Sequence, residues 1–166
     1  MSERLAPEQV VKLLYEYFSE MVDIIFEQGG TLDKFIGDAI MANWGAPVAR
    51  PDDANRALQA AIEMQRELKL MNARRGPGEP RIEIGIGINH GPAFVGNVGS
   101  PRRLEYTVIG DAVNIASRLC GKAGAGEILI TESFLQALPE KPRVEALEPA
   151  QLRGRAERTL IHRVEW

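Results

Sequence analysis

Apolar residues recur with helical spacing in two long segments of the chain. In residues 7–28 they fall three or four positions apart with acidic residues between them, which predicts an amphipathic helix of about five turns. The glycine pair 29–30 ends this helix, because glycine readily adopts the left-handed conformation of a helix C-terminus. A second stripe of alanine, leucine and methionine predicts a helix that Asp52 or Asp53 caps and that ends before the loop at 74–78.

Shorter apolar runs predict β-strands between and after these helices. Residues 31–36 and 39–44 flank Gly37-Asp38, a connection typical of a primed two-residue hairpin, which would leave Asp38 at an exposed tip. In residues 82–88 isoleucine alternates with Glu83, Gly85 and Gly87, so we expect a β-strand. The branched isoleucine side chains would form its buried face, and the face that carries the two glycines would be thin and left open. Further strands are expected at 93–98, 104–109 and 127–131, short helices at 111–121 and 133–138, and small antiparallel strands within 143–166.

This order of elements predicts the fold class α/β (α+β), with helices packed on an antiparallel-rich sheet. The 166 residues are close to one typical domain, so we expect a single domain over residues 1–166. A hydrophobic fraction of 45% and a charged fraction of 26% are typical of a globular protein and exclude disorder as the main state. One strand is expected to be missing at the front, because no strand precedes the first helix for it to pack on.

Charge and cysteine content exclude several classes of function. The chain has 20 Lys and Arg against 23 Asp and Glu, a net charge of −3, which does not favour nucleic acid as a partner. Its one cysteine, Cys120, excludes an internal disulfide and favours a reducing, cytoplasmic location; we expect it to be a small buried residue at a helix end. No apolar run approaches the ~20 residues of a membrane span, although a longer parent protein could be membrane-anchored.

Two segments contain side chains that could carry chemistry. In residues 33–38 a lysine precedes a carboxylate at a hairpin tip, an arrangement that could hold a hard cation and contact a ligand. In residues 106–119, Asn114 and Arg118 are four positions apart and share one face of a predicted helix, which suits a polyanion whose charge develops during a reaction. Each segment taken alone is more typical of an ordinary solvated surface than of a functional site.

Together these segments resemble the class III nucleotidyl cyclase family, the catalytic domain of adenylate and guanylate cyclases. Residues 8–30 look like its first helix and 31–47 like its metal-bearing hairpin, while 84–100, which contains GIGINHGPAFVGNVGS, and 105–119 look like its two most recognisable stretches. The resemblance implies a ferredoxin-like sandwich. It also implies conversion of ATP to 3′,5′-cyclic AMP and pyrophosphate by two-metal-assisted attack of the ribose 3′-hydroxyl.

The resemblance assigns a role to five residues. Asp38 matches one of two aspartates that bind a pair of Mg²⁺ or Mn²⁺ ions. Lys34 matches the residue that reads the purine and Thr107 its partner; guanylate cyclases of this family usually have an acidic residue where Lys34 stands, so ATP is favoured. Asn114 resembles the residue that orients the ribose, and Arg118 the one that stabilises the pentacoordinate phosphorus.

In this family the site lies between the two chains of a head-to-tail homodimer. Asp38 of one chain would then serve a site read by the other four residues of its partner. Arg153 and Arg155 lie where the family often has a basic residue near the triphosphate, and they are further candidates for substrate binding. The arginine pair 102–103 is expected to be a solvated turn.

The sequence departs from the family pattern at its start. The family begins with a strand that carries the other metal-binding aspartate and then a Phe-Thr pair, whereas here Met1 directly precedes the segment that follows them. We therefore expect the chain as given to be weakly active or inactive as an adenylate cyclase, with upstream sensor or regulatory domains in its parent protein. An inactive regulatory or dimerisation module, or a guanylate cyclase, are the alternatives.

Overall fold

The computed structural model describes residues 6–149, 151 and 158–166, and its elements lie close to the expected positions. They are α1 (Pro7–Glu27), β1 (Thr31–Ile36), β2 (Ala39–Asn43), α2 (Asp53–Ala73), β3 (Ile86–Ile88), β4 (Phe94–Ser100), β5 (Arg103–Ile109), α3 (Asp111–Cys120), β6 (Ile128–Thr131), α4 (Glu132–Ala137), β7 (Val144–Ala146) and β8 (Ile161–Val164). Within these described ranges α1 comes first, and no helix is long and apolar enough to cross a membrane.

The centre of the molecule is a four-stranded sheet with helices on both faces. Its order is β3-β6-β8-β7, with β3 parallel to β6 and the other neighbours antiparallel. On β6, Ile128 and Ile130 pack with residues of α2 and α4, while Leu129 points the other way and packs with Ile115 and Leu119 of α3. This alternation is the period of a β-strand, and it builds a helix–sheet–helix sandwich around β6.

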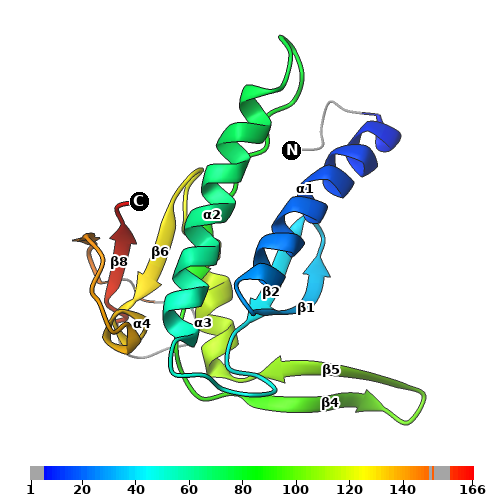
Figure 1. Cartoon of the computed structure of the whole chain (residues 1–166). Coiled ribbons are helices and arrows are strands. Elements are labelled where there is room, and N and C mark those ends of the chain that lie inside the picture. Colours follow the sequence, from blue (N-terminus) through cyan, green and yellow to red (C-terminus); the bar gives the residue numbers. More distant parts are fainter. Residues whose placement is uncertain (1–5, 150, 152–157) are drawn as a thin grey trace.

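Two hairpins lie outside this sheet. Strands β1 and β2 form one, strands β4 and β5 form the other, and each is a separate antiparallel two-stranded sheet. Figure 1 shows β4–β5 as a long arm that extends away from the four-stranded sheet, with α1 and α2 side by side above it. The rings of Phe18 on α1 and Phe35 on β1 are 4.2 Å apart, so the first hairpin is anchored to α1.

The strand expected at residues 82–88 is shorter than its isoleucine alternation predicts. Only Ile86–Ile88 pairs with a neighbouring strand. Before it, side chains of α2 satisfy the backbone: Asn72 accepts from the Ile82 N–H and donates to its carbonyl, and Gln65 donates to the Ile84 carbonyl. The prediction was wrong at 82–85 because the same backbone groups can bond to amide side chains instead of to a strand.

The thin face of this segment is also covered rather than open. A Cβ at Gly87 would lie 2.2 Å from the Cys120 N, and one at Gly85 would lie 2.3 Å from the Ala123 carbonyl oxygen. The glycines therefore let the end of α3 pack directly on the backbone. Cys120 does end α3 as expected, but it is exposed rather than buried, and its thiol donates to the Gly85 carbonyl at 3.5 Å.

Candidate active site

Asp38 lies at the tip of the hairpin β1–β2, as the sequence predicts. Ile36 pairs with Ala39, so Gly37 and Asp38 form a two-residue turn, and Asp38 is exposed. Gly37 has φ 64°, and no residue other than glycine has a positive φ in the described part of the chain. This fits a type II′ turn, whose first central residue requires a positive φ.

Asp33 is the buried centre of the contact between the two hairpins. Its side chain is 2% exposed. Its two oxygens accept a hydrogen bond from the Thr107 hydroxyl, with oxygen–oxygen distances of 2.8 and 2.9 Å. One of them also accepts a hydrogen bond from the Val108 N–H, at a nitrogen–oxygen distance of 3.0 Å. One carboxylate on β1 thus fixes two consecutive residues of β5.

A β-bulge explains why this carboxylate points away from β2. In the β1–β2 register, Leu32 pairs with Ala42 and Lys34 pairs with Met41, so Asp33 has no partner residue on β2. A bulge inserts an extra residue and turns its side chain out of the regular alternation. The bulge turns Asp33 toward β5, beside Lys34.

Lys34 lies between two carboxylates. Its Nζ is 3.0 Å from Glu105 Oε2 and 3.6 Å from Asp33 Oδ1. The hydrogen bond to Glu105 raises the pKa of Lys34 above its ordinary value. The same bond, with help from Arg103, lowers the pKa of Glu105. Both groups are therefore charged at neutral pH, and the ammonium group is held over β5.

Thr107 is buried at the edge of a small cavity. The residue is 7% exposed, and the cavity of about 40 Å³ is lined by both hairpins. Asn43 also lines it, and the buried Asn43 Oδ1 has no hydrogen-bond partner among the described residues. The cavity is small and its lining is mainly apolar, so any polar group that reaches Thr107 must satisfy its hydrogen bonds there.

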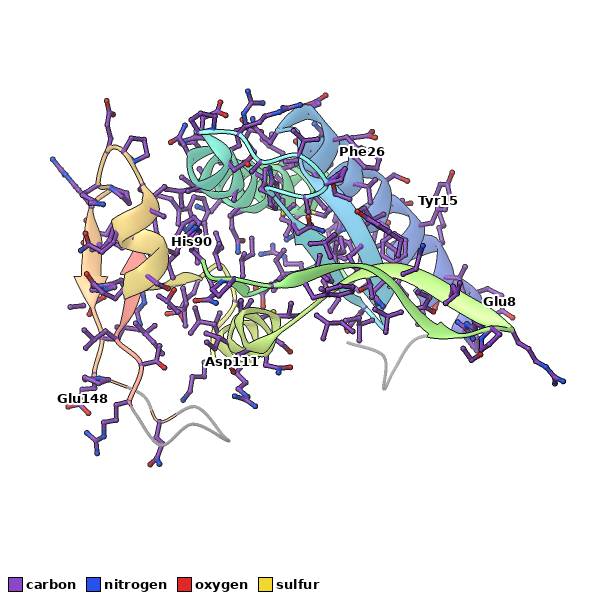
Figure 2. The ribbon with its side chains drawn as sticks, turned by 90° about the horizontal axis from the view of Figure 1, so that it is seen from below. Glu8, Tyr15, Phe26, His90, Asp111 and Glu148 are labelled. Atoms are coloured by element: carbon purple, nitrogen blue, oxygen red, sulfur yellow. The ribbon has the colours of Figure 1, made fainter. Side chains whose placement is uncertain are left out.

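Asn114 and Arg118 lie on the side of α3 that faces away from the sheet. Asn114 is exposed and Arg118 is partly exposed, whereas Ile115 and Leu119 are buried against β6 and β8. Figure 2, seen from below, shows α3, marked by Asp111, with nothing of the four-stranded sheet over its outer side. The predicted polar face is therefore available for a ligand.

The structure brings together some of the predicted site residues and not others. Lys34 and Thr107, from segments far apart in sequence, meet through Asp33. Asp38 forms no hydrogen bond or ion pair with Asn114 or Arg118 in the part of the chain that is described. Arg153 and Arg155 lie outside the described residues, so their expected role stays a prediction.

The residues around Asp38 fit a metal site only in part. Its exposed carboxylate is the kind of oxygen ligand that Mg²⁺ and Mn²⁺ prefer. Among the described residues, however, no group of three His, Cys, Asp or Glu side chains is placed to hold a metal ion. Asp38 can supply one ligand, and a complete two-metal site needs groups beyond those described.

Sequence reasoning missed two members of this cluster, Asp33 and Glu105. A weak signal for Asp33 was present, because aspartate is unfavourable inside a strand and here stands in a run that is expected to be one. Glu105 carried no such signal. Its pairing with Lys34 joins residues 71 positions apart.

Comparison with known proteins identifies similar chains. Residues 1–164 match the family model described as the adenylate and guanylate cyclase catalytic domain. An adenylate cyclase of Anabaena cylindrica is 41% identical over 176 residues, which cover 99% of this chain and 34% of that protein. The chain spans 34% of that protein's length and 25% of the length of Adenylate cyclase 1 of Rhizobium meliloti, another relative that it matches.

Solved structures with the same fold include enzymes named for either nucleotide. The guanylyl cyclase Cya2 has a TM-score of 0.92 and 40% identity, over 98% of this chain and 83% of that one. The adenylyl cyclase CyaB from P. aeruginosa has a TM-score of 0.93 and 35% identity, over 99% of this chain and 86% of that one. Overall likeness therefore does not distinguish ATP from GTP as a substrate.

Proposed function

Because the chain belongs to the adenylate and guanylate cyclase catalytic domain family, we propose that it converts ATP to 3′,5′-cyclic AMP and pyrophosphate. In this reaction the ribose 3′-oxygen attacks the α-phosphorus and loses its proton, and the bond from that phosphorus to the pyrophosphate oxygen breaks. The choice of ATP over GTP is carried by one observation: Lys34 and Thr107, from the two hairpins, both contact the same carboxylate, that of Asp33.

The two side chains suit the hydrogen-bonding edge of adenine. Lys34 is a cation that can only donate, so it fits the acceptor nitrogen of the adenine ring. The Thr107 oxygen can accept from the exocyclic amine of adenine. Guanine has a carbonyl oxygen at that place, which would meet a second acceptor as long as the Thr107 hydroxyl donates its proton to Asp33, and a buried site rejects such a pair strongly.

Asn114 and Arg118 are proposed to act on the sugar and the phosphates. The Asn114 amide can both donate to and accept from a ribose hydroxyl, and so orient the attacking oxygen. The Arg118 guanidinium would stabilise the negative charge that develops on the oxygens of the α-phosphate. Both side chains lie on the ligand-accessible side of α3.

Asp38 is proposed as one ligand of the metal pair that the family uses, Mg²⁺ or Mn²⁺. Such ions, when bound, neutralise the triphosphate and favour loss of the 3′-hydroxyl proton. Asp38 is suited to this because a two-residue turn places it at the exposed tip of the hairpin.

A second copy of the chain is proposed to complete the site. The hairpin β4–β5 leaves large apolar side chains uncovered, and the end of β1 does the same: Phe35, Ile36, Phe94, Leu104, Tyr106 and Ile109 are all exposed. An exposed apolar surface of this kind is typical of an interaction site. In a head-to-tail homodimer, Asp38 of one chain would meet the nucleotide bound by the other.

Guanylate cyclase activity is the second candidate function. It is favoured by one finding, the 40% identity to the guanylyl cyclase Cya2 over nearly the whole chain. It is disfavoured by Lys34, which places a donor where a guanine would need an acceptor for its ring N–H.

Conversion of ATP and GTP in the presence of Mn²⁺ tests the proposal, both for this chain and for an N-terminally extended protein. We expect cyclic AMP as the main product in the extended protein. Replacing Lys34 by Glu and Thr107 by Cys should lower ATP use and raise relative GTP use, because donors and acceptors are exchanged. An unchanged ATP:GTP preference in the double variant would show that these two residues do not read the base.

A further inference from the structure

Asp33 touches both proposed base-reading residues and, with Thr107, lines the small cavity between the hairpins. Its carboxylate accepts the Thr107 hydroxyl with both oxygens and is 3.6 Å from Lys34 Nζ, yet its side chain is 2% exposed. We infer that Asp33 is a positioning residue that fixes the direction of the Thr107 hydroxyl and so sets the purine preference. This inference rests on the proposed function and deepens it.

The hydrogen-bonding capacities of the two groups fix that direction. An ionised carboxylate has only acceptor atoms, and a threonine hydroxyl has one proton and two acceptor lone pairs. At 2.8 and 2.9 Å from the carboxylate oxygens, the Thr107 hydroxyl must therefore donate to Asp33. Its lone pairs remain for a partner in the cavity, and that partner must be a donor.

The backbone prevents Asp33 from giving up this contact easily. The bulge between Leu32 and Lys34 turns its side chain toward β5. The Val108 N–H, at 3.0 Å, occupies one carboxylate oxygen at the same time. Rotation of the carboxylate away from β5 would leave a buried backbone donor without a partner, which is costly.

The consequence is selection at the 6-position of the purine. Adenine has an amine there, which donates, and guanine has a carbonyl oxygen, which accepts. A Thr107 hydroxyl whose proton is held by Asp33 can pair with the amine and repels the carbonyl. The same threonine with a free hydroxyl could turn and serve either base, so Thr107 alone does not explain a preference.

The variant Asp33→Asn tests this directly, because it keeps the size of the side chain and reverses the direction of its hydrogen bond with the Thr107 hydroxyl. The amide oxygen would take the Val108 N–H, and the amide nitrogen would donate to the Thr107 oxygen. The hydroxyl proton would then point into the cavity and favour a carbonyl. We expect the ratio of kcat/KM for ATP to that for GTP to fall by about tenfold or more in the extended protein.

A Thr107→Val background separates positioning from general damage. With no hydroxyl to turn, the addition of Asp33→Asn should leave the ATP:GTP ratio at the value of Thr107→Val alone. Asp23→Asn, an exposed position on α1, is the matched control and should leave the ratio unchanged. If Asp33→Asn does not fold by circular dichroism, Asp33→Ser serves instead. Its hydroxyl can accept as well as donate, so the Thr107 proton is no longer held in one direction, and the ratio is expected to fall toward no preference.

Each result has one meaning. An unchanged ratio in a folded Asp33 variant, beside a wild type that prefers ATP, would overturn the inference and leave the proposed function standing. A change of equal size in the Thr107→Val background would also overturn it, because Asp33 would then act without the hydroxyl. A wild type that neither binds nor converts ATP or GTP would overturn the proposed function, and the inference with it.

Discussion

The four-stranded sheet and the two hairpins differ in how much of their apolar surface the chain itself covers. On β6, the side chains of Ile128, Leu129 and Ile130 are all at most 3% exposed, because helices cover both faces. On β5, Leu104 and Tyr106 are more than half exposed. One part of the molecule completes its own core, and the other presents apolar surface outward.

The candidate chemistry lies almost entirely in the part that is not covered. Lys34 and Asp38 belong to the first hairpin and Thr107 to the second, while Asn114 and Arg118 lie on the outer side of α3. The sheet therefore supplies stability and holds α3 in place. The hairpins supply Lys34, Asp38 and Thr107, which we propose form a complete site only when two chains come together.

The largest effect is expected at Arg118, where loss of function should leave stability unchanged. Arg118→Ala should lower the cyclase rate by about 10²–10³, as loss of other transition-state charge stabilisers does. Arg118→Lys should recover part of this, because it keeps the charge and loses the planar fork. The measurements are kcat and the midpoint of thermal unfolding. If the rate falls together with the unfolding midpoint, Arg118 stabilises the fold and does not act in catalysis.

A matched pair of leucines tests the contrast in burial. Leu129 is 3% exposed and Leu104 is 59% exposed, and both lie on strands. Leu129→Ala should lower the free energy of unfolding by about 2–5 kcal/mol through lost burial and a cavity. Leu104→Ala should change it by no more than about 0.5 kcal/mol in dilute, monomeric protein. Urea unfolding measures both, and equal losses would contradict the comparison.

The smallest effect concerns the exposed ion pair between Lys34 and Glu105. The hydrogen bond from Lys34 lowers the pKa of Glu105. The ion pair therefore adds to folding stability at pH values above the ordinary glutamate pKa, and this stability is lost as pH falls through the lowered pKa. In a Lys34→Met variant the titration of Glu105, followed by NMR of its carboxyl carbon, should move to higher pH. A midpoint that does not move would show that the two side chains do not pair in solution.

Elements governed by local periodicity were predictable from sequence. The stripe of α1 places Met21 and Ile25, both 0% exposed, on its buried side, and the Gly37-Asp38 turn is where the pattern indicates. The expected fold class, a class III cyclase sandwich, is confirmed by the likeness to solved cyclase structures. These features depend on neighbours in the chain.

Features that depend on distant partners were not predictable. The backbone of Ile82 and Ile84 bonds to side chains of α2 instead of to a strand, and the parallel pairing of β3 with β6 joins segments about 40 residues apart. The role of Asp33 needs both a bulge against β2 and a hydroxyl from β5. No pattern within residues 31–36 contains that information.

Complementation between two inactive variants tests most directly whether the site is shared by two chains. Asp38→Ala and Arg118→Ala should each be nearly inactive as homodimers in the extended protein. When they are mixed, one site of each heterodimer has every group intact and the other carries both lesions, so cyclic AMP formation should recover to a large fraction of its wild-type rate. A mixture no more active than the separate variants, with subunit exchange demonstrated, would contradict a site shared between two chains.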